Sequence, residues 1–301
     1  DNTNAWDAAY PGVEVLPDGT FVTTTYGHWI GGEEPFVVSV RFTLAELDAR
    51  VEGLSAPFTP VPRGTGNPIE VWYLGHCGFA VKVGTKLLVF DYVSEQGTPA
   101  VDPVAGGLDD GSIAPVDLEG LDVYAFTTHS HEDHYDPTVL EWEEEVENIH
   151  YFFGWEAGED PNHHYLVGPR ATAEVGGLRI YTINSHHSGV PEVAYLVQVE
   201  DRWIYHNGDY RQDYIPDFQY LETLTDRLDV AFTAGLHDER WQYTHQAHYL
   251  MEHFQPGALF PMHHGDQEEE GEAFARVMAE RGYDTFIPVP RRRGDRWVLG
   301  G

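Results

Sequence analysis

The sequence is poor in basic residues and contains no long apolar run. Its 301 residues include 17 Lys and Arg against 50 Asp and Glu, which gives a formal net charge of −33. A chain this negative repels nucleic acid backbones and anionic lipid, so we expect neither nucleic acid nor a membrane as a partner. No apolar run reaches the roughly 18 residues that a membrane-spanning helix needs, so we expect a soluble protein. Residue 1 is aspartate rather than methionine, which leaves open whether the protein is cytoplasmic or exported.

Cysteine and lysine are almost missing. Cys77 is the only cysteine, which excludes an internal disulfide, and we expect no thiolate zinc site. Lys82 and Lys86 are the only lysines, so arginine supplies nearly all of the positive charge. This composition fits adaptation to high salt and an ordinary acidic protein equally well. The sequence does have the material for a core, because 42% of its residues are hydrophobic and 13% are aromatic.

The composition changes near residue 66. Residues 1–66 are rich in Gly, Pro and Thr and contain two strand-like runs, FVTTTY and FVVSVRF, and a helix-like segment that opens at Thr43. Residues 56–68, APFTPVPRGTGNP, are interpreted as a linker because prolines and glycines suit neither a helix nor a central strand. We therefore expect an N-terminal extension, residues 1–66, packed on a main domain, residues 67–301. The role of the extension stays open.

The main domain alternates between strand-like and helix-like patterns. Three runs between residues 69 and 91 predict a β meander, and a further strand, residues 122–128, follows an insertion, residues 92–121, that contains no recognisable motif. A helix capped near Asp136 and Pro137 is predicted to run through TVLEWEEEVENI to residue 149. More strands follow, and beyond residue 218 helices and strands alternate. This mixture predicts an α/β fold with two sheets and helices outside them.

The motif THSHEDHYD, residues 128–136, follows the apolar strand directly. His129 and His131 are two apart, which in an extended segment aims both imidazoles at the same side. Asp133 and His134 lie on the turn before the predicted helix and could close over the same point. Imidazole and carboxylate are good ligands for zinc and other first-row divalent metals. A histidine-rich polar loop is the alternative, but chance rarely provides this spacing at a strand-to-helix junction, so the motif predicts a metal site.

Further candidate ligands stand at the ends of later strands. Asp209 follows the strand RWIYHN and His263 follows the strand GALFPM, and open α/β sheets place ligands at such carboxyl ends. Alone, Asp209 would be interpreted as a turn residue and His263 as a core histidine; together with the motif they indicate a shared site. Asp91 also ends a strand and either orients a ligand histidine or forms a turn. His76, in GHCG, is either a hydrogen-bonded turn residue or a residue that lines the site, and we favour the turn.

These motifs resemble those of the metallo-β-lactamase-fold superfamily of metal-dependent hydrolases. The resemblance covers roughly residues 69–301 and rests on five motifs in the expected order: YLGHCGF with LLVFD, HxHxDH, INSHHSG, IYHNGDY and FPMHHGD. The opening strands are similar to those of the ascorbate-phosphate-lactonase-like branch. The resemblance implies a four-layer αβ/βα sandwich and two divalent metal ions, zinc or else manganese or iron.

The resemblance also implies a ligand set. One metal would be held by His129, His131 and His187, the second by Asp133, His134 and His263, and Asp209 would bridge both. His186 could take the place of His187, and the spacing P-x-H favours His263 over its neighbour His264.

Such a site implies a hydrolase without a serine or cysteine nucleophile. Two metals about 3.5–4 Å apart share a water, lower its pKa to roughly 7 and polarise the substrate oxygen. We assign Asp133 to orienting the resulting hydroxide, and Arg240 and His245 to contacting a small-molecule substrate. The expected function is hydrolysis of a small ester, lactone or phosphodiester; the alternatives are an iron-dependent redox enzyme on the same fold and a non-catalytic binding protein. The oligomeric state is left open.

Overall fold

The computed structural model describes residues 12–27, 36–45, 66–94, 107–155, 161–185, 189–209, 215–234, 242–263, 268–283 and 285–300. The chain separates into two compact units, residues 1–63 and residues 64–301. The packing of the extension on the main domain stays a prediction. Among the described helices, none is both long and apolar enough to cross a membrane.

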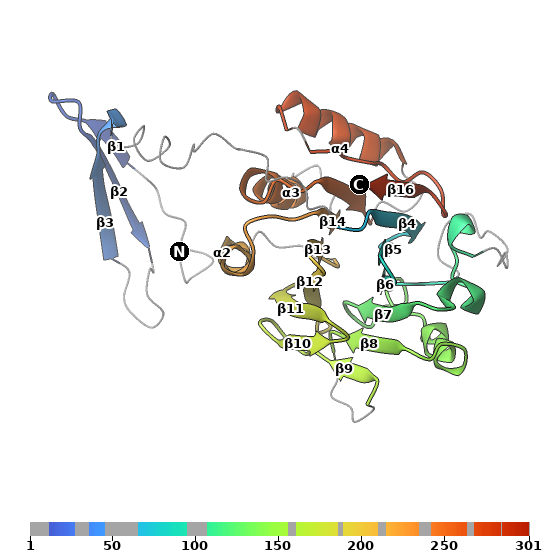
Figure 1. The fold of residues 1–301 in the computed structure, drawn as a ribbon. Helices are drawn as coiled ribbons and strands as arrows, with labels where there is room; N and C mark the ends of the chain where they lie inside the picture. The colour runs from blue at the N-terminus through green and yellow to red at the C-terminus, as the bar shows by residue number, and fades with distance from the viewer. Residues whose placement is uncertain are drawn as a thin grey trace. The chain divides into compact units, whose positions relative to one another are not determined.

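The first unit contains a small antiparallel sheet. Its strands β1 (Gly12–Val15), β2 (Phe21–Gly27) and β3 (Phe36–Phe42) pair in sequence order (Figure 1). The rings of Phe21 and Phe42 stack across β2 and β3 with centroids 5.5 Å apart. Both strand-like runs predicted in this segment therefore form strands, while most of the helix expected from Thr43 lies outside the described residues.

The second unit is built on two large sheets. A seven-stranded sheet has the order β16-β4-β5-β6-β7-β8-β9, and a six-stranded sheet has the order β10-β11-β12-β13-β14-β15. In the first sheet β4, β5 and β6 form the predicted antiparallel meander, and β6 to β9 run parallel. In the second sheet β13, β14 and β15 run parallel. The strands of the first sheet are β4 (Ile69–Gly75), β5 (Gly78–Val83), β6 (Lys86–Phe90), β7 (Asp122–Thr127), β8 (Ile149–Phe153), β9 (His163–Tyr165) and β16 (Arg296–Leu299). Those of the second are β10 (Thr172–Val175), β11 (Leu178–Asn184), β12 (Val193–Val199), β13 (Arg202–His206), β14 (Val230–Ala234) and β15 (Ala258–Met262).

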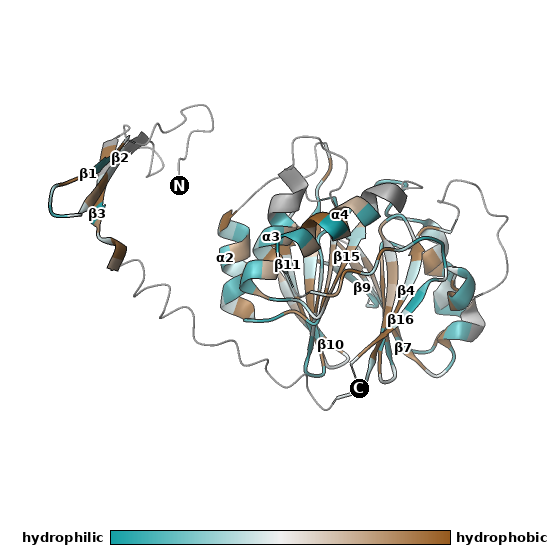
Figure 2. Ribbon diagram, turned by 90° about the horizontal axis from the view of Figure 1, so that it is seen from above, coloured by the Kyte–Doolittle hydropathy of each residue, from teal (hydrophilic) through white to brown (hydrophobic). Residues whose placement is uncertain are grey.

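Three hydrophobic clusters define four layers. The central cluster lies between the sheets and includes Phe79 and Phe90 from the first and Phe232 and Phe260 from the second. An outer cluster on the first sheet is covered by the 3-10 helices η1 (Leu108–Asp110), η2 (Pro115–Leu118) and η3 (Pro137–Glu144). The outer cluster on the second sheet is covered by α2 (Ile215–Leu224), α3 (Gln242–His253) and α4 (Glu268–Glu280). Figure 2 shows the sheets edge-on with these helices outside. The predicted αβ/βα sandwich is confirmed.

The described part of the insertion, residues 107–121, belongs to the outer layer of the first sheet. Leu108, Ile113 and Leu118 pack into its cluster, and the Trp72 indole N–H donates to Asp109 at 3.0 Å. This part of the insertion therefore covers apolar surface.

The predicted helix after the motif is shorter than expected. It begins after Asp136, as predicted, but it is a 3-10 helix that ends at Glu144 rather than continuing to residue 149. Glutamates crowd its carboxyl end and no basic residue lies in its last turn, which opposes the helix dipole. Val139 and Trp142, three apart and therefore on one face of a 3-10 helix, are buried against the first sheet.

Replacing Asp136 with alanine is expected to lower the free energy of unfolding by about 1–2 kcal/mol. The Asp136 carboxylate accepts hydrogen bonds from the Thr138 N–H at 2.9 Å and from the N–H and hydroxyl of Ser94, so it joins two segments. Urea unfolding measures the change. Asp136→Asn is the matched control. Asparagine is also a good N-cap, so the free energy of unfolding of this variant should fall by less. Equal losses in the two variants would contradict this account of the cap.

Candidate metal centre

The candidate site lies where the parallel strands of both sheets end. Asp91 follows β6 and the motif follows β7 in the first sheet, while Asp209 and His263 follow β13 and β15 in the second. Because parallel strands end at the same edge of a sheet, these side chains come together although they are far apart in the sequence. The phenyl rings of Phe90, Phe126 and Phe152 stack beneath this edge, with centroids 4.9 and 4.6 Å apart, and keep the strand ends in register.

Asp91 anchors the start of the motif. Its Oδ1 accepts the Thr128 N–H at 2.8 Å, and its Oδ2 accepts the Thr128 hydroxyl at 2.8 Å and the His134 Nδ1–H at 2.7 Å. All three residues are buried. Asp91 therefore orients a histidine, one of the two roles that the sequence suggested for it.

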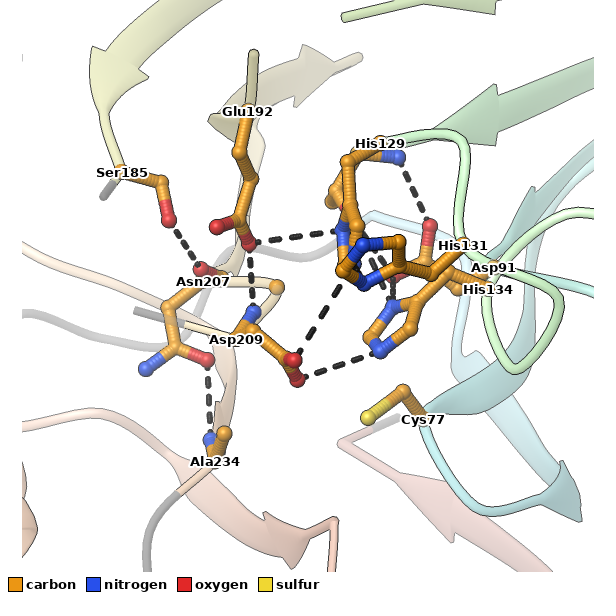
Figure 3. A network of polar contacts seen from close by, with 12 residues as sticks. Cys77, Asp91, His129, His131, His134, Ser185, Glu192, Asn207, Asp209 and Ala234 are labelled. Carbon is orange, nitrogen blue, oxygen red and sulfur yellow. Dashed lines mark hydrogen bonds and ion pairs between the residues drawn. The ribbon is translucent and has the colours of Figure 1, made fainter. Parts of the chain in front are cut away.

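The imidazoles of the motif converge on Asp209 (Figure 3). His134 Nε2 lies 3.1 Å from Asp209 Oδ1, and His263 Nε2 lies 2.9 Å from the same oxygen. His129 Nε2 lies 3.1 Å from His131 Nδ1 and 4.0 Å from Asp209 Oδ2. The two carboxylate oxygens of Asp209 thus face different imidazoles.

The donor atoms form three groups whose members lie within 4.8 Å of one another. These groups are His129, His131 and Asp133; His76, Asp133, His134 and His263; and Cys77, His134 and Asp209. Six of the seven predicted ligands are among them. The seventh, His187, lies outside the described residues, as do His186, His264, Arg240 and the side chain of His245.

His76 belongs to the site as well as to its turn. It lies between β4 and β5, its Nε2 is 3.4 Å from Asp133 Oδ2, and its ring centroid is 4.3 Å from that of His263. Burial lowers the pKa of His76 even though Asp133 opposes the shift. The sequence favoured the turn over the site-lining role, because nothing in GHCG indicates which side chains its imidazole meets.

Glu192 is a buried carboxylate that the sequence did not single out. Its Oε1 accepts the Asp209 N–H at 2.6 Å and lies 3.6 Å from His129 Nδ1. Gly208, with a φ of 61°, leaves room for it, since a Cβ at that position would collide with Glu192. Burial raises the pKa of Glu192 to about 8. The only signal in the sequence is a charged residue at the entry to the apolar strand VAYLVQV.

Three site residues adopt a left-handed backbone. His76, Asp91 and His263 have φ values of 50°, 43° and 64°, a region that residues other than glycine seldom occupy. Such conformations cost of order 1–3 kcal/mol each and persist where the surrounding structure enforces them.

Which ring nitrogens carry protons decides whether these side chains can bind a cation. The Asp91 carboxylate can only accept, so His134 Nδ1 bears the proton and Nε2 can direct its lone pair at Asp209 Oδ1. Two acceptors 3.1 Å apart need a proton or a metal ion between them. Burial disfavours a second proton on His134, but Cys77 and the Asp91 and Asp209 carboxylates raise its pKa well above the ordinary value. Burial lowers the pKa of His129 to about 3, so that ring is neutral and can act as a ligand. The donor set fits divalent metal ions.

The site is open to solvent on the side of the motif. A pocket of about 640 Å³ is lined by Ser130, His131, Glu132 and Asp133. His129 and His134 lie buried behind it.

Comparison with known proteins identifies the family. A family model described as β-lactamase superfamily domain matches residues 70–263, more than half of the chain. No curated protein sequence matches this chain.

Solved structures share the fold at low identity. Igni18, a metallo hydrolase from the hyperthermophilic archaeon Ignicoccus hospitalis, is 18% identical with a TM-score of 0.57, over 78% of this chain and 99% of its own. CmlA, a diiron β-hydroxylase from Streptomyces venezuelae, is 13% identical with a TM-score of 0.54, over 93% and 69%. An isothiocyanate hydrolase from Delia radicum gut bacteria is 14% identical with a TM-score of 0.52, over 76% and 98%. With motif order, fold and family model in agreement, the chain belongs to the β-lactamase superfamily and has the metallo-β-lactamase fold.

Proposed function

We propose that this chain is a dinuclear metal-dependent hydrolase that acts on a small ester, lactone or phosphodiester. The main support is the meeting of imidazoles from one sheet with Asp209 and His263 from the other, where His134 Nε2 and Asp209 Oδ1 face each other at 3.1 Å. A fold alone does not establish a function, but this donor set suits divalent metals specifically. Membership of the superfamily and likeness to Igni18, which is named as a metallo hydrolase, agree with the proposal.

The two metal positions follow from the groups of donor atoms. His129, His131 and Asp133 would hold one ion, together with the predicted ligand His187. His134 and His263 would hold the other with Asp133, and Asp209 would lie between the two. Zinc, manganese and iron all accept such ligands. Two such ions, when bound, lower the pKa of a shared water to roughly 7 and polarise a substrate oxygen.

Asp133 is the residue that we assign to orienting the attacking water. It borders the pocket, and its pKa is lowered chiefly by the hydrogen bond with His76 and further by the charge of His134. It is therefore ionised at neutral pH and can accept a hydrogen bond from water. His76 holds the Asp133 carboxylate from the turn between β4 and β5, so its role is positioning. Arg240 and His245 remain the predicted substrate contacts.

Two alternatives make different predictions. The first alternative is an iron-dependent redox enzyme. Its support is the likeness to CmlA, which is named as a diiron β-hydroxylase. A non-catalytic binding protein would keep the fold without the chemistry. Within hydrolases, the ascorbate-phosphate-lactonase-like branch and the isothiocyanate hydrolase indicate which substrates to include first.

The full chain, purified without chelator or histidine tag, is expected to contain about two metal ions per chain by inductively coupled plasma mass spectrometry. Hydrolysis of a lactone, phosphodiester, thioester or isothiocyanate is expected to stop on treatment with chelator and to return when metal is added back. Iron with no hydrolysis would favour the redox enzyme. A protein that binds no metal even after reconstitution would overturn the proposal and favour a binding protein.

A further inference from the structure

We propose that Cys77 supplies a thiolate ligand to the metal held by His134, with Asp209 as a third donor. This inference rests on the proposed function, because it concerns the same metal centre. It departs from the expectation that a single cysteine excludes a thiolate ligand. That expectation holds for sites built from several cysteines, whereas one thiolate can join imidazole and carboxylate around zinc.

The three donor atoms already lie close together. Cys77 Sγ, a ring nitrogen of His134 and a carboxylate oxygen of Asp209 lie within 4.8 Å of one another, and all three residues are buried. Metal–ligand bonds of about 2.0–2.3 Å would bring such atoms to roughly 3.5 Å from one another, so the three donors would move closer together on binding. Figure 3 shows the Cys77 sulfur beside His134 and Asp209.

A second observation indicates a ligand at this point. His134 Nε2 is fully buried, makes no hydrogen bond of normal geometry and lies 3.1 Å from Asp209 Oδ1, while Nδ1 of the same ring is bound to Asp91. A buried ring nitrogen without a partner is costly, and a metal ion would satisfy it. Cys77 and Asp209 are the other two donors that share this position.

The position of the sulfur argues against a purely packing role for Cys77. A buried cysteine is usually a small apolar residue, and Cys77 does contact the central hydrophobic cluster. Its sulfur, however, faces an imidazole and a carboxylate. Its backbone is held in place as well, since its carbonyl accepts the His206 Nε2–H at 2.9 Å and the His206 ring stacks on Phe90 at 5.1 Å.

Coordination requires the thiol to lose its proton. Burial raises the pKa of Cys77 to about 12 in the metal-free protein. When the metal binds, the S–H bond breaks, a metal–sulfur bond forms and the proton leaves to solvent, with no change in oxidation state. A coordinating thiol is deprotonated outright by the charge of the ion. Because thiolate is a soft ligand, this site would prefer zinc to manganese.

X-ray absorption at the zinc edge tests the assignment on the zinc-loaded full chain. We expect one sulfur atom at about 2.3 Å for every two zinc ions. Since Cys77 is the only cysteine, Cys77→Ser and Cys77→Ala should both lose this signal. Met262→Leu, which removes the buried thioether next to His263, is the matched control and should keep it.

The outcomes separate the two proposals. Two zinc ions with only nitrogen and oxygen neighbours would overturn the Cys77 ligand and leave the dinuclear hydrolase standing. A sulfur signal that persists in Cys77→Ser would also overturn it. A chain that binds no zinc would overturn both. If neither cysteine variant folds, the wild-type spectrum compared with that of Met262→Leu still decides the question.

Discussion

Replacing Asp209 with asparagine is expected to reduce the metal content to at most one ion per chain and to lower the rate of hydrolysis by about a thousandfold or more. Asp209 faces His134 and His263 with one oxygen and His129 with the other. An asparagine amide would offer one acceptor and point its NH₂ group at an imidazole or a metal. Metal ions contribute several kcal/mol to transition-state stabilisation, and each 1.36 kcal/mol is a factor of ten in rate.

Metal analysis and steady-state kinetics together test this prediction. The matched control is Asp217→Asn, which changes another buried aspartate, on α2, whose carboxylate accepts from Asn184 at 3.1 Å. That variant should keep both metal ions and its activity. Two tightly bound ions in Asp209→Asn would mean that Asp209 does not bridge them.

Replacing Asp91 with asparagine is expected to act through stability and metal affinity together. The carboxylate accepts three hydrogen bonds, from the Thr128 N–H, the Thr128 hydroxyl and His134 Nδ1. An amide would turn its own NH₂ toward one of these donors and leave a buried ring without its partner. Breaking a buried charged pair costs about 3–5 kcal/mol, and loss of a partner behind a ligand costs 10–100-fold in metal affinity.

Urea unfolding of the metal-free protein and competition with a chromophoric chelator measure the two effects. Asp229→Asn is the matched control, since Asp229 also accepts from a backbone N–H and a charged side chain, those of Trp203 and Arg202, away from the motif. The Asp229→Asn substitution should lower the free energy of unfolding and leave the metal affinity unchanged. An Asp91→Asn protein with wild-type stability would show that these hydrogen bonds contribute little.

Part of the site could be predicted because its residues are close together in the sequence. His129, His131, Asp133 and His134 fall within one turn after a buried strand, so their proximity needs no knowledge of the tertiary fold. Asp209 and His263 could be predicted because each ends a recognisable apolar strand, and parallel strands β13 to β15 deliver such residues to one edge.

The other site residues and two short strands could not be predicted, because their positions depend on contacts between segments that are far apart in the sequence. Glu192 reaches His129 only because the two sheets face each other, and no local pattern encodes that contact. Cys77 and His76 lie in a turn whose neighbours are set by β15, more than 180 residues later. Strands β9 and β16 were not predicted because they have three and four residues, too few to show a period, and β16 pairs with β4 from the far end of the chain.

The left-handed backbone at His76, Asp91 and His263 limits how this protein can be made more heat-resistant. Glycine would relax each position, since a left-handed L-residue costs roughly 1–2 kcal/mol, but glycine offers neither imidazole nor carboxylate. Screening for thermal tolerance alone would therefore reward the loss of the residues that the chemistry needs, a stability–activity trade-off. Gln255 shares this backbone conformation, with a φ of 44°, just beyond the end of α3, and it is not one of the candidate ligands. Engineering for robustness is better directed there, where a glycine C-cap removes strain and no ligand is lost.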